Sequence, residues 1–448
     1  MTRLDGADQV LTGWGRTAPS RAFVTAPGDV ARLQEIIAAQ PARGLLARGA
    51  GRSYGDAAQN AGGYVLHPVT PPRVELDPAA ATAQVSASTT FTELLEQVVP
   101  HGLLPPVLPG TRHLTVGGAV AADVHGKNQH RDGTISAWLD EIDLLDGEGR
   151  RCRITPGGEP GAFRATVGGM GLTGVILGVR LRLLPIGGTA LQVTSRRLPD
   201  LDALLAAMDA ATSRYAVAWI DPSGGGRSLG RGVLDTGDHL TGPGPADTDG
   251  LAYRPGRAPR APALPFCLFT PVTARAFNGI WYRTAPAEVS GLVPLHRYFH
   301  RLDAVSQWNR ALGPRGFLQY QFVVPPGAEK IIAEVLTMLR RHHAAPFLGT
   351  LKRFGPASGN YLSFPGPGWS LAVDLPAGRG EGLGTVLDHL DRRVAELGGR
   401  IYLAKDARLR PDTFAAMYRS LGLWRAARER LDPRGVFCSD LGRRLDLC

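Results

Sequence analysis

The amino-acid sequence predicts an α+β fold with two domains, and three observations support that fold class. The chain has 448 residues, more than a single compact core usually holds. From residue 22 to about residue 185, short apolar runs alternate with glycine turns, and several strand candidates follow one another without a helix between them. Amphipathic helices and further strands follow. A regular βαβ array is therefore disfavoured for the first domain.

Apolar periodicity and capping residues place the individual elements. Short apolar runs predict strands at residues 64–67, 83–86, 175–184 and 215–220, and the run at 175–184 also alternates with a period of two. Helical spacing predicts helices at residues 30–39, 92–99 and 383–397, and Asp200 is expected to cap a further helix. We expect the apolar stripes of these helices to pack in the core.

Prolines and glycines mark the divisions of the chain. The sequence Pro185-Ile186-Gly187-Gly188 predicts a domain boundary. Residues 222–265 are dense in Gly, Pro, Asp and Arg, and a structureless connection of that length is unusual inside a compact domain. Two interpretations of this segment stay open, a mobile lid over a site and a plain surface loop.

Composition and charge limit the classes of partner. A net charge of +10 favours anionic ligands or an anionic membrane surface. Nucleic acid is disfavoured because the arginines are spread along the chain without a nucleic-acid-binding motif. The sequence shows no apolar run of about 18 residues and no signal peptide at its N-terminus, so we expect a cytoplasmic or membrane-associated protein.

The four cysteines give no sign of a disulfide framework or a metal site. Cys152, Cys267, Cys438 and Cys448 are widely separated, with no CxxC pair and no histidine at zinc spacing. We therefore expect reduced thiols and no bound metal.

Two glycine loops carry the strongest signal in the sequence. The first, ARGAGRSYGDAAQN (47–60), lets backbone N–H groups approach an anion while Arg52 and Ser53 supply further donors. On its own this loop fits a phosphate site and an ordinary turn equally well. The second, VLPGTRHLTVGGAVAADVHGKNQH (107–130), adds a run of small residues that can lie flat against a planar group. The pair favours a large phosphorylated ligand.

With these loops, the chain resembles the vanillyl-alcohol-oxidase superfamily of PCMH-type FAD enzymes. The likeness is to the branch that oxidises polyprenylphosphoryl-β-D-ribose in arabinan biosynthesis of the cell wall, and it covers nearly the whole chain. It is carried in order by LTGWGRTAPS (11–20), GRSYGDAAQN (51–60), VLPGTRHLTVGGA (107–119), HGKN (125–128), ATVGGMGLTG (165–174), FLQYQFVVP (317–325), LSFPGPGW (362–369) and YLAKD (402–406). Several motifs in one order are far more specific than any single motif.

The resemblance implies the domains and the reaction. Residues 1–188 would form the FAD-binding domain, residues 189–398 a substrate domain of antiparallel sheet and helices, and residues 399–448 would return to the FAD domain. The implied reaction oxidises the ribose 2'-hydroxyl to a 2'-ketone, and a separate NADH-dependent short-chain reductase would complete an epimerisation. Family members are placed at the cell envelope. A soluble polyol, aldose or aldonolactone is the alternative substrate class.

The implied cofactor is non-covalent FAD. Related oxidases have a histidine directly before the serine of the first loop, which bonds covalently to the flavin, whereas this chain has Arg52. The implied cofactor-binding residues are Arg48, Gly49, Ala50, Gly51, Arg52, Ser53, Tyr54, Gly55, Asp56, Gly110, Thr115, Val116, Gly117, Gly118, Ala122, Asp123, His125, Ile176 and Tyr402. The formal GxGxxG at residues 169–174 precedes a predicted strand instead of opening a helix, so nicotinamide binding is disfavoured.

Lys405 is the expected catalytic base, which accepts the hydroxyl proton as hydride leaves the carbon. The alternative is a surface lysine paired with Asp406. The resemblance adds Tyr402 and His125 to the catalytic set. The implied substrate-binding residues are Tyr54, Lys127, Trp219, Gln319, Gln321, Lys352, Phe354 and Ala372.

The spacing of the two glutamines and the charge of the two lysines agree with substrate binding. Gln319 and Gln321 are two positions apart and share a face if they lie on a strand. Lys127 and Lys352 would provide positive charge for a phosphate. Two residues depart from the family pattern: Ala372 replaces a cysteine that hydride transfer does not require, and Phe299 replaces a tyrosine and lacks its hydroxyl.

Overall fold

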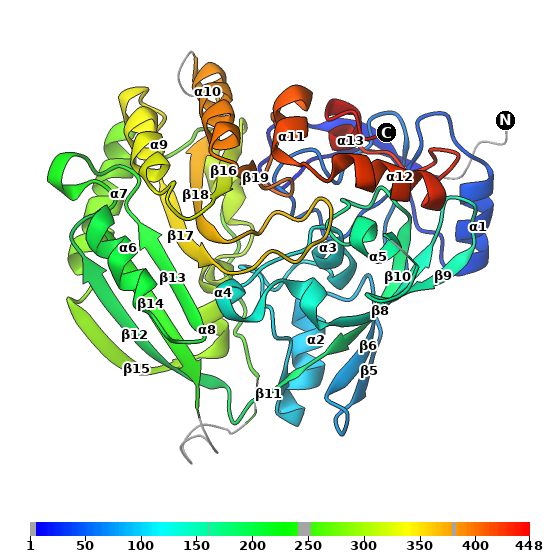
Figure 1. Cartoon of the computed structure of the whole chain (residues 1–448), viewed down its shortest axis with the longest axis horizontal. Helices are drawn as coiled ribbons and strands as arrows, with labels where there is room; N and C mark the ends of the chain where they lie inside the picture. Colours follow the sequence, from blue (N-terminus) through cyan, green and yellow to red (C-terminus); the bar gives the residue numbers. More distant parts are fainter. Residues whose placement is uncertain (1–5, 160, 241–250, 252, 379–381) are drawn as a thin grey trace.

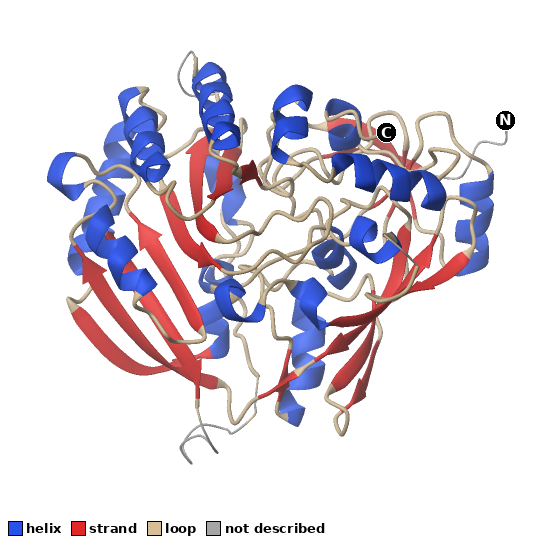
Figure 2. Cartoon of the chain, viewed as in Figure 1, coloured by secondary structure: helices blue, strands red, loops and turns tan. Residues whose placement is uncertain are grey.

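The computed structural model describes residues 6–159, 161–240, 251, 253–378 and 382–448. Their strands form four sheets, with four, five, two and eight strands. Figure 1 shows the N-terminal sheets on one side of the molecule and the eight-stranded sheet on the other. Figure 2 shows loops filling the region between them. The architecture is α+β, as predicted.

The first sheet brings the chain to the first glycine loop. Its strands, in spatial order, are β1 (Ala7–Leu11), β2 (Ser20–Thr25), β4 (Tyr64–Leu66) and β3 (Leu45–Ala47). Helix α1 (Val30–Ala38) connects β2 to β3, and the Asp29 side chain caps it by accepting from the Arg32 N–H. Because β3 ends at Ala47, the loop starts directly at the edge of the sheet.

The second sheet is antiparallel and carries the second glycine loop. Its order is β5 (Val74–Asp77), β6 (Thr82–Ser86), β10 (Val175–Arg182), β8 (Leu139–Leu145) and β9 (Arg151–Ile154). Strands β7 (Leu103–Leu104) and β11 (Leu184–Pro185) form the two-stranded sheet. The helices of this region are α2 (Phe91–Val98), α3 (Val116–Ala121), α4 (Gln129–Asp132) and α5 (Ala162–Thr166). Residues 169–174 precede strand β10, in agreement with the prediction against a nicotinamide fingerprint.

The eight-stranded sheet dominates the middle of the chain. Its order is β15 (Glu288–Pro294), β12 (Ala190–Leu198), β14 (Gly232–His239), β13 (Tyr215–Ile220), β17 (Leu348–Phe354), β18 (Gly368–Pro376), β16 (Phe317–Val324) and β19 (Arg400–Ile401). The helices of this region are α6 (Leu201–Asp209), α7 (Pro271–Thr284), α8 (Leu295–Phe299), α9 (Lys330–Arg341) and α10 (Leu383–Glu396). The apolar faces of α6, α9 and α10 share one buried core with the strands. The cap predicted at Asp200 is confirmed, because its side chain accepts from the Ala203 N–H.

The C-terminal segment contacts both halves of the molecule. Strand β19 pairs with β16, and α11 (Pro411–Met417), α12 (Leu421–Leu431) and α13 (Asp440–Arg444) follow. Phe437 then forms a β-bridge with Leu45 of the first sheet. In Figure 1 the red C-terminal helices accordingly lie beside the blue N-terminal elements.

The segment 222–265 is more ordered than the sequence predicts. Strand β14 falls inside it and pairs along its length with both β12 and β13. Its sequence GVLDTGDH has glycines and aspartates that hide the alternation, and pairing with two neighbours overrides low strand propensity. The prediction of a structureless connection is therefore wrong for residues 232–239. Residues 241–250 and 252 of the same segment lie outside the described part of the chain.

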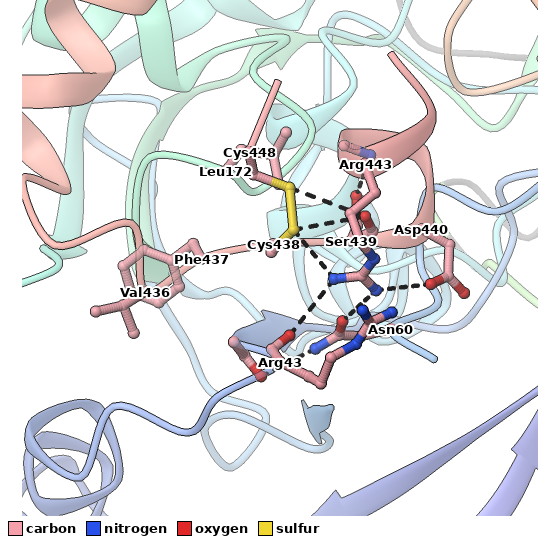
Figure 3. The surroundings of a disulfide bond; sticks show 12 residues. Arg43, Asn60, Leu172, Val436, Phe437, Cys438, Ser439, Asp440, Arg443 and Cys448 are labelled. Carbon is pink, nitrogen blue, oxygen red and sulfur yellow. Dashed lines mark hydrogen bonds and ion pairs between the residues drawn. A yellow bond between two sulfur atoms is a disulfide. The ribbon is translucent and has the colours of Figure 1, made fainter. Parts of the chain in front are cut away.

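The prediction of four reduced cysteines is also wrong. Cys438 and Cys448 form a disulfide, with their Cα atoms 5.6 Å apart, whereas Cys152 and Cys267 are free. Helix α13 turns the chain back so that the two residues meet, and no sequence motif signals that turn. Figure 3 shows Arg443 beside the disulfide, where it donates to Asn60 at 2.6 Å and to Asp440 at 2.7 Å.

Candidate active site

A cavity of ≈ 600 Å³ lies between the glycine loops and the eight-stranded sheet. Strands β13, β16, β17 and β18 supply one wall, and the turn after β19 supplies another. The predicted site residues that line it are Gly49, Ala50, Gly51, Arg52, Ser53, Tyr54, Gly110, Thr115, Gly118, Ala122, His125, Lys127, Trp219, Gln319, Gln321, Lys352, Ala372, Tyr402 and Lys405. Positions more than 350 residues apart thus meet at one site.

The two glycine loops are packed against each other. A Cβ on Gly49 would overlap the Thr115 side chain, and a Cβ on Gly117 would meet the Ala87 methyl group at 2.8 Å. The Thr115 hydroxyl accepts from the Gly118 N–H, which holds the start of α3. Small residues therefore leave a narrow, flat space along the cavity, which fits a planar cofactor.

The first loop is also fixed to the turn that carries Lys405. The Tyr54 N–H donates to the Ala404 carbonyl at 2.9 Å. A Cβ on Gly55 would overlap the Asp406 carbonyl oxygen. Arg444 binds both Asp56, at 2.8 Å, and Asp406, at 2.8 Å, so one guanidinium joins the two segments.

Eight predicted residues lie behind the cavity wall instead of on it: Arg48, Gly55, Asp56, Val116, Gly117, Asp123, Ile176 and Phe354. Arg48 donates to the backbone carbonyls of Thr12 and Ala58, so its charge supports the loop from behind. Asp123 accepts from Ser363 at 2.6 Å. Phe354 packs edge-on against the His125 ring, with centroids 4.8 Å apart. These residues shape the wall without facing the cavity.

Arg52, the residue on which the prediction of a non-covalent cofactor rests, lines the cavity. Its guanidinium lies 4.2 Å from the centre of the Trp14 ring, and its Nε donates to the His113 carbonyl at 3.3 Å. The side chain is therefore held in place, and it cannot form the histidine–flavin bond.

Lys405 is enclosed and faces the cavity. Its Nζ lies 3.7 Å from the centre of the Tyr54 ring. Burial lowers the pKa of Lys405 to about 7, with the charge of Asp374 acting against this and the charge of Lys352 reinforcing it. The alternative of a surface pair with Asp406 is wrong, because Asp406 is buried and bound to Arg444.

Asp374 is a site residue that the sequence interpretation missed. It lies on β18 opposite Gln319 of β16, and the Gln319 side chain donates to it at 2.7 Å. Burial raises the pKa of Asp374 to about 7. The available signal was an aspartate inside the apolar run SLAVDLP, two residues after Ala372 and hence on the same face.

The side chains of His125 and Tyr402 are buried, and burial shifts the pKa of both. Burial holds the pKa of His125 well below its usual range, and the charges of Lys352 and Lys405 add to this, so the imidazole is neutral. The Tyr402 hydroxyl donates to the Ala122 carbonyl at 3.0 Å, and burial raises its pKa. Neither group is therefore suited to take up a proton near neutral pH, and their catalytic roles stay a prediction.

Two more half-buried lysines share the cavity with Lys405. Burial lowers the pKa of Lys127 to about 7 and that of Lys352 to about 8. The Lys127 ammonium donates to the Tyr298 carbonyl and lies 4.0 Å from the centre of that ring. Arg301, bound to Asp235 at 2.9 Å, also lines the cavity. An anionic ligand group would restore the fully charged state of these lysines.

The remaining predicted substrate residues lie on the sheet wall. Gln319 and Gln321 both face the cavity from β16, so their predicted shared face agrees with the structure. Ala372 lies opposite Gln321. Phe299 lines the cavity, and the neighbouring Tyr298 is buried.

The fold and the cavity define an FAD-binding oxidoreductase. Residues 21–155 match the family model of the FAD binding domain. Over its full length the chain belongs to the family of decaprenylphosphoryl-beta-D-ribose oxidases: it is 38% identical to the decaprenylphosphoryl-beta-D-ribose oxidase of Mycolicibacterium smegmatis over 98% of this chain and 97% of that protein.

More distant relatives match a smaller share of the chain. An alditol oxidase from a Streptomyces species is 29% identical over 39% of this chain and 42% of its own length. Cytokinin dehydrogenase 1 of Oryza sativa is 31% identical over 47% of this chain and 40% of its own length.

The described residues contain no group of three or more His, Cys, Asp or Glu side chains arranged to hold a metal ion. Within the same part of the chain, no helix combines the length and apolar character needed to cross a bilayer.

Proposed function

We propose that this protein oxidises the 2'-hydroxyl of a polyprenylphosphoryl-β-D-ribose to the 2'-ketone, with non-covalently bound FAD as the hydride acceptor. The observation that carries the proposal is Lys405, a half-buried lysine with a pKa of about 7 at the junction of the glycine loops and the sheet wall. The likeness to the mycobacterial oxidase over 98% of the chain supports the choice of substrate.

Lys405 acts as the general base. At its pKa of about 7, roughly half of the lysine is neutral at pH 7 and able to take the hydroxyl proton. FAD, when bound, would supply the chemistry that the side chains lack, because it can accept the hydride from the carbon that carries the hydroxyl. Asp374, with Gln319 donating to it, balances the charge that Lys405 gains. Gln321 donates to Ser370 at 3.3 Å, so its amide is held toward the cavity for sugar hydroxyls.

The cofactor would lie along the glycine loops, and the substrate phosphate would lie beside Lys127, at the end of the second loop, and Lys352 on the sheet wall. Gly49, Gly51 and Gly118 would leave space beside the backbone for FAD, and Arg52 would supply positive charge for its phosphates. Lys127 and Lys352 bind the substrate phosphate as point charges, which explains why two partly neutral lysines are kept in a buried wall. Trp219 packs against the sugar, and Phe299 contacts it without a hydroxyl.

The partners follow from the chemistry of the product. A 2'-ketone becomes the epimeric alcohol only when a second enzyme returns hydride to the other face, and we assign that step to a separate NADH-dependent short-chain reductase. The lipid tail of the substrate also calls for peripheral contact with a membrane, which the net charge of +10 favours on an anionic surface.

Anaerobic stopped-flow spectroscopy tests the proposal. A polyprenylphosphoryl ribose should bleach the flavin band near about 450 nm, whereas ribose 5-phosphate, sorbitol and an aldonolactone should not. Bleaching by sorbitol or the lactone at an equal rate would favour the alternative, an oxidase of soluble polyols or lactones. A yellow, FAD-loaded protein that no polyprenylphosphoryl sugar bleaches would refute the proposal.

A further inference from the structure

Helix α7 presents its apolar side chains to solvent and its small side chains to the protein. Val272 is 77% exposed and Ile280 is 62% exposed. The buried positions of the same helix are Ala274, Asn278 and Gly279. A helix at the surface of a globular protein normally has the opposite arrangement, so the apolar face of α7 has no partner within the described structure.

The exposed apolar surface extends beyond the helix. Phe266 is 58% exposed and Leu268 is 50% exposed, both in the segment that leads into α7. Single exposed apolar residues are ordinary, but a run of large ones within two turns and an adjoining loop marks a binding surface. We call these four side chains, Phe266, Leu268, Val272 and Ile280, the apolar platform.

The platform is continuous with the cavity that contains Lys405. Phe277 and Trp281 of α7 are partly exposed and also line the cavity. Trp281 lies 6.4 Å from Trp219, measured between ring centroids, so aromatic contacts extend from the sheet wall to the helix. Leu302 and Val305 add exposed apolar side chains at the same cavity wall.

The charge around the platform selects its partner. Residues 251–287 contain five arginines and no aspartate or glutamate. Arg275 and Arg283 are exposed on α7, and neither forms an ion pair with a described residue. Apolar side chains flanked by arginines suit the headgroup region of an anionic bilayer. A second copy of this chain would bring the same arginines together, which is unfavourable.

We propose that the apolar platform and α7 insert into the interface of an anionic membrane, so that the cavity opens toward the bilayer. A 14-residue helix is about 21 Å long and lies in the plane of the interface. The polyprenyl tail would then pass from the lipid along Phe277 and Trp281 without crossing water. Only this last step rests on the proposed function.

Vesicle sedimentation tests membrane insertion without the sugar substrate. The FAD-loaded protein should bind vesicles of phosphatidylcholine with phosphatidylglycerol, and binding to pure phosphatidylcholine should be weaker by about tenfold or more. The double variant V272D/I280D should need about tenfold more lipid for half-binding. Leu423→Asp, at a residue 59% exposed on α12, is the matched control and should bind like the wild type. Arg275→Gln should weaken binding about fivefold.

Several results would overturn the proposal. Wild-type protein that ignores anionic vesicles would do so, as would V272D/I280D binding equal to that of the wild type. A wild-type dimer in gel filtration that V272D/I280D dissociates would identify a second copy as the partner instead. Val272 and Ile280 do not line the cavity, so flavin bleaching by a short-tailed, water-soluble substrate should be unchanged in the variant. If the wild-type protein binds anionic vesicles but no polyprenylphosphoryl ribose bleaches its flavin, that result would count against the proposed function alone.

Discussion

Replacing Asp374 by asparagine should shift the pH dependence of flavin reduction to lower pH. Asparagine keeps the oxygen that accepts from Gln319 and removes only the charge. That charge raises the pKa of Lys405, which stands at about 7 with Asp374 present. A nearby opposite charge typically shifts a pKa by one to three units, and Asp374 is itself only partly ionised because its pKa is about 7. We therefore expect the Lys405 pKa to fall by about one unit, to about 6.

The sign of the effect follows from the role of the base. Lys405 accepts a proton only when neutral, so the rate rises with pH through its pKa and reaches a plateau above it. With a pKa of about 7, roughly a tenth of the lysine is neutral at pH 6, and with a pKa of about 6 roughly half is neutral. Flavin reduction at pH 6 should thus become about fivefold faster relative to the plateau, with little change at pH 8.

Single-turnover bleaching of the flavin from pH 5.5 to 9, at saturating substrate, measures the shift. Asp412→Asn removes an exposed carboxylate far from the cavity wall and is the control. If the pH at which the rate reaches half of its plateau is the same in Asp374→Asn as in the wild type, or is higher, then Asp374 does not act on the base or Lys405 is not the base.

Three other outcomes follow from the structure. Lys405→Met should bind FAD normally, as followed by flavin fluorescence, and reduce it about 10²–10⁴-fold more slowly; an unchanged rate would exclude Lys405 as the base. Acid precipitation should release the yellow colour into the supernatant because Arg52 replaces the linking histidine, and colour in the pellet would contradict this. Cys448→Ser should lower the free energy of unfolding in urea by about 3 kcal/mol, because the disulfide closes a loop with a sequence separation of 10, whereas Cys152→Ser, at a free thiol, should change it by less than about 0.5 kcal/mol.

Elements with strong local signals could be predicted closely from the sequence. The strand predicted at 215–220 has those bounds in the structure, and the helices predicted at 30–39 and 383–397 end one residue early. Capping aspartates and apolar periodicity are local features, so they suffice for such elements. The domain limits at residues 188 and 398 stay a prediction.

Elements that depend on distant partners could not be predicted. Strand β14 lacks a clear pattern and exists because β12 and β13 pair with it. The Cys438–Cys448 disulfide depends on the turn at α13. Asp374 could be recognised only when the strand register placed it opposite Gln319. The glycine loops were found from their own residues, whereas Lys405 was found through a resemblance spread over many motifs.

The bridge from Arg444 to Asp56 has a consequence for biosynthesis. The two residues are 388 positions apart, so at about 5–20 residues per second the glycine loop leaves the ribosome roughly 20–80 s before its arginine partner. During that interval the loop lacks the turn around Asp406 that packs against it. We therefore expect stable cofactor uptake to follow synthesis of the last helix, because only then is the first glycine loop packed on both sides.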